Sequence, residues 1–309
     1  LIFHHTEMPT TTSLTTTYAG ELAGEILRPA LLEFTSAKHI TVKSNVPYKA
    51  VVRKLVDNVT FAAGTCDFTP TGTITLTERI LTLEEFQVQR QLCKKDFFTD
   101  WSTKDVMSGR MNADILAAIL ERITGGAAAN LERIVWQGVN ATAGEFDGLG
   151  TLIDANAGSD INFVASPIPL TAANILAKMY LLVAECPTAV KGATEKPTIY
   201  FNQNTWELYM QALAASGALW NMPGDNAQPI FMGNYPIAVC PGIADNTMYM
   251  AQKSNLWFGT WLESDYNSVS VLDMEALEAS QNIRISMRFY AGAQLGVTSD
   301  ITAYGPGLS

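Results

Sequence analysis

Apolar residues recur at every fourth position along one stretch in the middle of the chain, residues 111–137. These positions are Ile115, Ile119, Ile123, Ala127, Leu131 and Val135. A four-residue spacing places such side chains near one face of a helix. At about 1.5 Å per residue, a helix over this stretch would be roughly 40 Å long, longer than most helices of globular proteins. The pattern therefore predicts one long helix as the central element.

Particular residues mark the ends of this helix and a weak point inside it. Asp105 or Asn112 is suited to cap the start, and Gly138 marks the stop. Gly125 and Gly126 each cost about 1 kcal/mol in a helix interior. We therefore expect a bend or a close backbone crossing at this glycine pair.

The segment before the helix has a different pattern. Residues 40–89 contain β-branched runs separated by turn-forming residues, which predicts long hairpin strands. A hairpin of this size cannot bury both faces on itself, so its apolar face needs another surface. Val51, Val52 and Leu55 are the apolar residues that we expect to contact that other surface.

The N-terminal part predicts an arm. Residues 8–17 are rich in threonine and show neither helical nor strand periodicity, which indicates an extended segment. A short helix is expected from about residue 19 to residue 33, with Leu22 and Ile26 sharing its apolar face. We expect these two apolar residues to contact another surface as well.

Helices and strands alternate after the long helix. Thr171 is expected to cap a helix that carries Ile175, Met179 and Leu182 on its inner face, and a buried strand follows at residues 197–201. Further along, the pattern predicts a helix started by Asn202 or Asn204 and closed by Gly217, strands at residues 229–232, 235–240 and 247–251, and two long strands between residues 281 and 304. Short turns between alternating elements indicate a mixed α/β unit.

Composition and charge narrow the class of protein. Of the 309 residues, 48% are apolar and only 16% are charged, against a usual charged share of about 25%, as expected when much of the surface faces partners. The net charge is −10: residues 1–110 carry 12 basic and 12 acidic residues, and the rest carry 8 and 18. Because no basic stripe exists to follow phosphates, sequence-reading nucleic-acid binding is not expected.

The chain offers little chemistry for catalysis or metal binding. Its four cysteines are far apart and its three histidines form no zinc-binding spacing, so free thiols and no metal or cofactor are expected. Asp147 is interpreted as capping its own turn, and the acidic stretch 263–278 as a solvated face, because it lacks calcium-loop spacing. The usual nucleotide, hydrolase and metalloprotease motifs are absent, and no apolar run reaches the length of a membrane span.

The order of segments resembles the major capsid proteins of tailed bacteriophages (Caudovirales), which have the Hong Kong 97 phage-type capsid fold. The long helix ends in a small-residue turn and is followed by Phe146-Asp-Gly-Leu149, like the spine helix and following loop of that family. Tyr200-Phe-Asn202 and the later segment 231–237 are similar to passages of the family's axial domain. The series covers nearly the whole chain, and the resemblance rests on the order of the motifs and not on any single one.

This resemblance implies an α+β fold with a defined division. The implied parts are an N-arm (1–39), an extended E-loop hairpin (40–85), a peripheral domain with the spine helix at about 111–137 and a long sheet (86–165), an axial α/β domain (166–264) and C-terminal strands that complete both domains (265–309). The implied role is structural, not enzymatic.

The resemblance further implies hexamers and pentamers that form an icosahedral head around double-stranded DNA, without sequence-specific binding. In such rings the hairpin and the N-arm contact neighbouring subunits, which makes the expected subunit-interface residues Leu22, Ile26, Val51, Val52 and Leu55. Portal, decoration or scaffolding proteins are implied partners, and the virion, assembled in the host cytoplasm, is the implied location. Some family members cross-link subunits between a loop lysine and an asparagine; Lys43, Lys49 and Lys54 lie in the hairpin region, but non-covalent clamping is expected. The first residue is Leu, for which N-terminal maturation and trimming are both explanations.

Two other classes stay open at this stage. An encapsulin-like shell would share the fold and hold a protein cargo. A monomeric α/β binding protein or hydrolase would instead be compact, with its hairpin folded back on itself.

Overall fold

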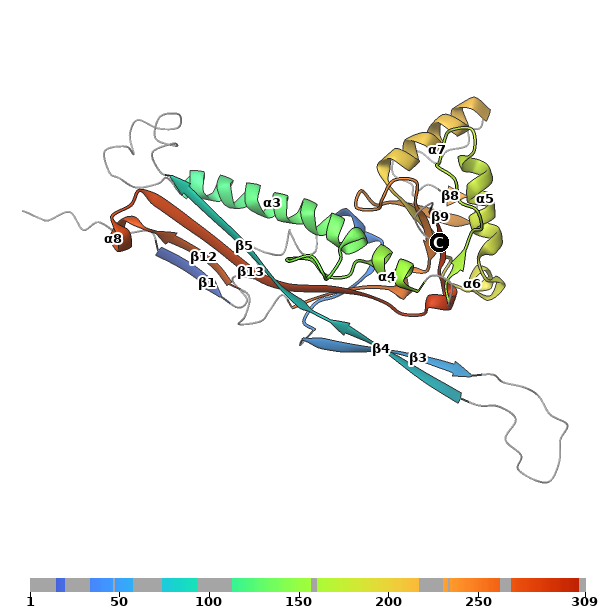
Figure 1. The fold of residues 1–309 in the computed structure, drawn as a ribbon, viewed down its shortest axis with the longest axis horizontal. Coiled ribbons are helices and arrows are strands. Elements are labelled where there is room, and N and C mark those ends of the chain that lie inside the picture. Colours follow the sequence, from blue (N-terminus) through green and yellow to red (C-terminus); the bar gives the residue numbers. More distant parts are fainter. Residues whose placement is uncertain are drawn as a thin grey trace, which may run out of the picture.

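The structure, a computed structural model, describes residues 15–19, 34–46, 48–57, 74–93, 113–156, 160–216, 230–232, 234–261 and 268–305. Within these residues the chain forms a long sheet, a long helix lying along it, a second sheet with its own helices, and a projecting hairpin (Figure 1). The α+β class expected from the sequence is confirmed.

The long sheet is organised around one strand that pairs on both sides. Its strands are β1 (Thr15–Ala19), β2 (Thr41–Lys43), β5 (Glu84–Cys93), β11 (Leu256–Thr260), β12 (Ser268–Asp273) and β13 (Asn282–Leu295). One side of β13 pairs with β5, and its other side pairs with β12 and then with β11. Outermost, β1 adds to β12 antiparallel and β2 adds to β11 in parallel. Segments from both ends of the chain therefore share one sheet.

Ala19 is the last residue of the strand β1, which pairs with β12, so the helix expected from about residue 19 does not include it. The rest of that expected helix, residues 20–33, lies outside the described residues. The expectation of two long strands at the C-terminal end was wrong. The C-terminal region forms only one long strand, β13, since the chain turns away at Gly296 and Val297. The buried Asn255 holds this turn: its side-chain amide donates to the Val297 carbonyl at 2.7 Å, and its own carbonyl accepts the Gly296 N–H at 2.9 Å.

The long helix α3 (Ala113–Gln137) lies over one face of this sheet (Figure 1). It confirms the expected helix to within two residues at the start. Gly138 is confirmed as the stop: its N–H donates to the Ile134 carbonyl, and an added Cβ would lie 2.4 Å from the Phe146 carbonyl oxygen. The helix continues unbroken through Gly125 and Gly126. Apart from the helix's own backbone, no described atom lies within 4 Å of a Cβ built at either glycine, so the described residues do not form the close backbone crossing that was one of the two expectations there. Asp105 and Asn112 lie outside the described residues.

The second sheet has the strand order β6-β14-β10-β7-β9-β8 and mixes parallel and antiparallel pairs, as expected for the α/β unit. Its strands are β6 (Asn162–Phe163), β7 (Thr198–Phe201), β8 (Ile230–Phe231), β9 (Tyr235–Val239), β10 (Met248–Ala251) and β14 (Thr302–Tyr304). The last of these is the remainder of the expected C-terminal strand pair. The predicted buried strand, β7, is buried at all four positions.

Six helices and three short 3₁₀ turns complete the described residues. Besides α3 they are α4 (Leu149–Ala155), α5 (Ile175–Glu185), α6 (Thr188–Gly192), α7 (Gln203–Ser216), α8 (Glu275–Glu278), η1 (Thr35–Lys38), η4 (Lys253–Asn255) and η5 (Thr298–Asp300).

The starts of α5 and α7 test the capping predictions. Asn202 caps α7 as expected, since its side-chain oxygen accepts the Thr205 N–H at 2.8 Å. Thr171 does not cap α5. It lies in a turn before the helix, in which the Asn174 N–H donates to the Thr171 carbonyl and the Asn174 side chain accepts the Thr171 N–H. The inner face of α5 is nonetheless the one predicted, with Ile175, Met179 and Leu182 buried. Gly217 lies outside the described residues.

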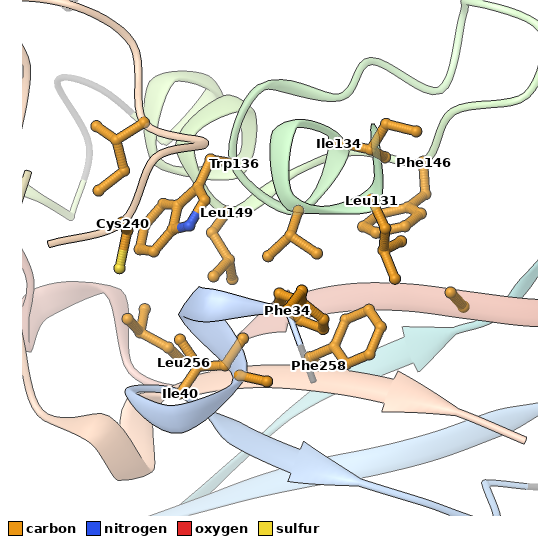
Figure 2. Packing of buried hydrophobic residues seen from close by; sticks show 14 of the residues in the cluster. Phe34, Ile40, Leu131, Ile134, Trp136, Phe146, Leu149, Cys240, Leu256 and Phe258 are labelled. Atoms are coloured by element: carbon orange, nitrogen blue, oxygen red, sulfur yellow. The ribbon is translucent and has the colours of Figure 1, made fainter. Parts of the chain in front are cut away.

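Two apolar clusters hold these layers together. The first joins the C-terminal half of α3 to the long sheet and to one face of the second sheet. Figure 2 shows part of it, with Phe34 and Phe258 below Leu131 and Phe146; the rings of Phe34 and Phe258 meet edge to face at 5.1 Å. The second cluster packs α5 and α7 on the other face of the second sheet. The second sheet is therefore covered on both faces.

Candidate subunit interface

The hairpin of β3 (Lys49–Asp57) and β4 (Ile74–Thr82) forms a separate two-stranded sheet that projects from the body (Figure 1). Its register sets Val51 opposite Ile80. Both side chains are exposed, Val51 by 45% and Ile80 by 51%. Facing side chains on one face of an antiparallel pair lie close enough to form a continuous patch. The hairpin therefore presents an uncovered apolar pair to its surroundings.

The opposite face of the hairpin is turned toward its own subunit. Val52 lies opposite Arg79 and is half-buried. The Arg79 guanidinium donates to the Thr298 hydroxyl at 3.2 Å and to the Asn156 side chain at 3.4 Å. Leu81, on this face, is fully buried and packs against Gly259, where an added Cβ would lie 2.7 Å from it. This face fixes the direction in which the hairpin leaves the body.

The predicted interface residues therefore differ in exposure, and some of them lie outside the described residues. Val51 is exposed and Val52 is not, because neighbouring strand residues point to opposite faces. Leu55 lies in β3 opposite Leu76 by backbone register, and its side chain is outside the described set. Leu22 and Ile26 lie outside the described residues.

Sequence reasoning missed several exposed apolar side chains. Ile80 carries the other half of the hairpin pair, and only the strand register could reveal it. Tyr180 and Met232 are exposed by 53% and 57% on the second sheet and its helices, where the Tyr180 ring lies 5.2 Å from that of Phe231. A signal for Tyr180 exists in the sequence of α5, which carries more large apolar residues than one inner face can hold.

A groove of about 590 Å³ runs between α3 and the edge of the long sheet. Phe86, Leu131 and Phe289 give it an apolar floor, and Glu85 and Arg288 are its ionisable lining residues. It places no nucleophile beside a base. Among the described residues, no group of three His, Cys, Asp or Glu side chains could hold a metal ion, and no described helix is long and apolar enough to cross a membrane.

Burial keeps one thiol and two phenols of the core neutral, those of Cys240, Tyr200 and Tyr249. Burial raises the pKa of the Cys240 thiol to about 12, and it also raises the pKa values of the Tyr200 and Tyr249 phenols. The Tyr200 hydroxyl donates to the His39 carbonyl at 2.8 Å. These groups serve packing and hydrogen bonding, since a neutral buried thiol is a poor nucleophile.

Two acidic segments differ in how far their sequence interpretation holds. Asp147 accepts the Asn140 N–H at 2.9 Å, which confirms its role in the loop after α3. In the stretch 263–278, Asp273 is buried and accepts the Glu275 N–H, so the expected solvated face was wrong at that position. The residue sits at the junction of β12 and α8, where a carboxylate satisfies the start of the short helix.

No protein-family model and no curated protein matches the sequence. Solved structures do match over nearly the whole chain. The capsid of an empty GTA particle matches with a TM-score of 0.60 and 14% identity, over 87% of this chain and 88% of that one. Mycobacterium phage Cain gives 0.58 and 15%, over 89% and 90%, and Microbacterium phage Oxtober96 gives 0.57 and 12%, over 99% and 95%. The chain therefore has the fold of tailed-phage major capsid proteins, as its sequence resemblance predicted.

Proposed function

We propose that this protein is a major capsid protein that assembles with copies of itself into the icosahedral head enclosing phage double-stranded DNA. The observation that carries the proposal is the projecting hairpin in a chain with the capsid fold. A two-stranded hairpin is marginally stable at best in water by itself. Its exposed Val51–Ile80 pair supports a role in contacts that a single subunit does not complete.

The proposed mechanism is overlap between neighbours. Fully burying a Val or Ile side chain contributes about 1.5–3 kcal/mol, so an apolar pair repeated at every contact adds up over a ring of subunits. The hairpin of one copy and its receiving surface on the next are different patches, which is a head-to-tail contact. Such contacts close into rings when the rotation per subunit closes. Hexameric and pentameric rings would then build the shell.

The proposed division of labour follows the capsid fold. The long sheet and α3 form the peripheral domain, the second sheet with α5 and α7 forms the axial domain, and the hairpin is the E-loop. Residues 1–39 act as the N-arm, whose candidate contact residues are Leu22 and Ile26. Portal, decoration and scaffolding proteins are the other proposed partners. The net charge of −10 opposes tight binding of the chain to phosphates. The closed shell would therefore confine the DNA without binding it tightly.

The role proposed is structural and not catalytic. A compact monomeric enzyme or binding protein would fold its hairpin back onto its own body. The described hairpin instead pairs only within itself and extends outward from the body (Figure 1).

The test is electron microscopy of the purified full chain, combined with light scattering and a measurement of nucleic-acid content. Closed shells or rings of subunits support the proposal, and DNA inside particles from infected cells identifies them as phage heads. Particles that hold a protein cargo instead would identify an encapsulin-like compartment. A persistent monomer of about 34 kDa under assembly-promoting salt and concentration would overturn the proposal.

A further inference from the structure

A buried carboxylate joins three distant segments of the chain. Glu132, in the last third of α3, is only 7% exposed. It meets Ser36 of η1, 96 residues away in sequence, and Gly242 in the loop after β9, 110 residues away. The same spot thus connects the long helix, the N-terminal part of the body and the second sheet.

Among the described residues, three groups donate hydrogen bonds to this carboxylate. The Ser36 N–H donates to Oε2 at 2.9 Å, the Ser36 hydroxyl donates to Oε1, and the Gly242 N–H donates to Oε1 at 3.3 Å. The Trp136 indole N–H in turn donates to the Ser36 hydroxyl at 2.7 Å. A carboxylate suits this place because it accepts only, with two oxygens and about four lone-pair sites.

The backbone approach at Gly242 leaves no freedom on that side. A Cβ added to Gly242 would lie 2.0 Å from the Glu132 carbonyl oxygen and 2.9 Å from the Trp136 ring. The Gln137 side chain also donates to the Gly242 carbonyl at 2.6 Å. The C-terminal end of α3 therefore packs tightly against the loop that follows β9. Cys240 lies at the start of this loop and faces Trp136 in the core (Figure 2).

Burying a carboxylate at this place costs free energy that an apolar contact would not. Within the part of the chain that the structure describes, no lysine, arginine or histidine forms an ion pair with Glu132. Burying a charge without a cation is costly unless several hydrogen bonds compensate it, and an apolar residue can often fill such a place as well or better. A charged acceptor that is kept in the core points to a requirement for a defined arrangement of its donors.

We propose that Glu132 is a positioning residue for assembly, which holds the N-terminal segment and the second sheet at fixed orientations on α3. This inference rests on the proposed capsid function. Ser36 belongs to the residues assigned to the N-arm (1–39), and Gly242 belongs to the proposed axial domain (166–264). Both surfaces that neighbours would contact are therefore oriented through one carboxylate, and the angle between them sets how far each subunit turns from the next.

The test compares two full-length variants that lose the same charge from the same helix. Glu132→Gln keeps the shape of the side chain but turns an amide N–H₂ toward groups that all donate, so at least one bond is lost. Glu121→Gln removes an exposed carboxylate from α3 and serves as the matched control. Ser36→Ala is a second test variant, which keeps the buried carboxylate and removes only the hydroxyl. Near-ultraviolet circular dichroism and urea unfolding establish that each variant is folded.

The first readout is amide hydrogen exchange of the unassembled subunit, resolved to residues 34–40 and 240–244. In Glu132→Gln and Ser36→Ala, exchange in the 34–40 segment should rise at least tenfold relative to wild type. In Glu132→Gln the 240–244 segment should respond as well, while exchange in α5 and α7 stays unchanged. Glu121→Gln should leave all of these segments as in wild type. A uniform rise across the subunit, or no local rise, would overturn the positioning role.

The second readout is the distribution of particle diameters in electron micrographs. Glu132→Gln should broaden this distribution or give open sheets and tubes, whereas Glu121→Gln should give wild-type shells. Wild-type diameters in a variant whose segments are loosened would overturn the link to assembly. If wild type itself forms no particles, the proposed capsid function fails, and the exchange comparison still decides whether Glu132 holds the two segments.

Discussion

The second sheet and the β3–β4 hairpin are both β-structure, but they are stabilised in opposite ways. All four residues of β7 are buried, with Tyr200 in the cluster against α3 and Phe201 in the cluster under α5 and α7. In the hairpin, the described side chains of Val51 and Ile80 are about half exposed, and the sheet has only two strands. Both faces of the second sheet are covered within the chain, whereas the outward face of the hairpin, with Val51 and Ile80, is not.

This difference indicates where stability and assembly reside. Substitutions in the second sheet should act on the folding of the subunit. Substitutions on the outward face of the hairpin should leave folding nearly unchanged and act on contacts between copies.

The largest expected effect is that of Phe201→Ala. Phe201 is fully buried in β7 and stacks on Trp206 with ring centroids 6.3 Å apart. Truncating a buried Phe costs about 3–5 kcal/mol because a cavity remains. Urea unfolding of the unassembled subunit should show this loss, whereas Val51→Ala should change the free energy of unfolding by less than about 0.5 kcal/mol. Equal losses in the two variants would erase the distinction between the regions.

The elements of the second sheet were also the easier ones to predict from sequence. The apolar run at β7, the amphipathic pattern of α5 and the Asn202 cap of α7 are local signals, and the structure confirms each of them. The long helix α3 was predictable for the same reason, since its period is carried by its own residues.

What sequence could not supply was pairing between distant segments. β1 has no sequence pattern of its own and forms by pairing with β12. β14 follows β13 of the long sheet along the chain but pairs with β10 in the second sheet. The hairpin was expected, but not which of its valines faces outward, because one step of register exchanges the two faces. Glu132 was placed on a helix by its neighbours in sequence, yet its burial depends on Ser36 and Gly242, about 100 residues away on either side.

Alkaline pH should weaken the body of the subunit through its buried thiol. Burial raises the pKa of Cys240 from 9.0 to about 12, so the folded state keeps a proton that the unfolded chain releases above pH 9. The stabilisation is fully present below that pH and is lost as the pH rises toward 12, at roughly 1.4 kcal/mol per pH unit. Tyr200 and Tyr249, whose pKa values are also raised, add to the loss at higher pH.

The measurement is the free energy of unfolding of the unassembled subunit between pH 8 and pH 10.5. Cys240→Ala should be less stable at every pH but should show a shallower decline above pH 9 than wild type. Cys93→Ala is the control, because Cys93 is only half-buried. Parallel pH profiles for wild type and Cys240→Ala would show that this thiol is not a source of the alkaline loss.

The next expected effect concerns assembly alone. Val51→Thr and Ile80→Thr keep β-branched side chains, and thus the strand preference, while removing apolar surface from the outward pair. Each should raise the concentration of subunits needed for assembly about tenfold, equivalent to about 1.4 kcal/mol. Light scattering against protein concentration measures this threshold, and urea unfolding of the free subunit should remain within about 0.5 kcal/mol of wild type.

The matched control for this pair is Val52→Thr on the inward face. Val52 lies opposite Arg79, whose side chain is hydrogen-bonded to the body. The Val52→Thr variant should therefore affect assembly less than the Val51→Thr variant does. A larger assembly defect in Val52→Thr than in Val51→Thr would reverse the assignment of the two faces.

The smallest expected effect separates two ion pairs, one in each region. In the hairpin, the Arg53 Nε lies 2.9 Å from a Glu78 carboxylate oxygen, and both side chains are well exposed at 65% and 46%. In the body, Glu145 pairs with Arg133 and also accepts the Val139 N–H at 3.2 Å, and its side chain is only 14% exposed.

An exposed pair contributes about 0–0.5 kcal/mol, because solvent and salt screen it. Glu78→Gln should therefore be nearly silent in urea unfolding of the free subunit, while Glu145→Gln should cost about 1 kcal/mol, since a backbone donor loses a charged acceptor. Raising the salt concentration should remove what little Glu78 contributes and leave most of the Glu145 difference in place. If Glu78→Gln cost as much as Glu145→Gln in the free subunit, the hairpin would have a stability of its own, and the contrast with the second sheet would have to be redrawn.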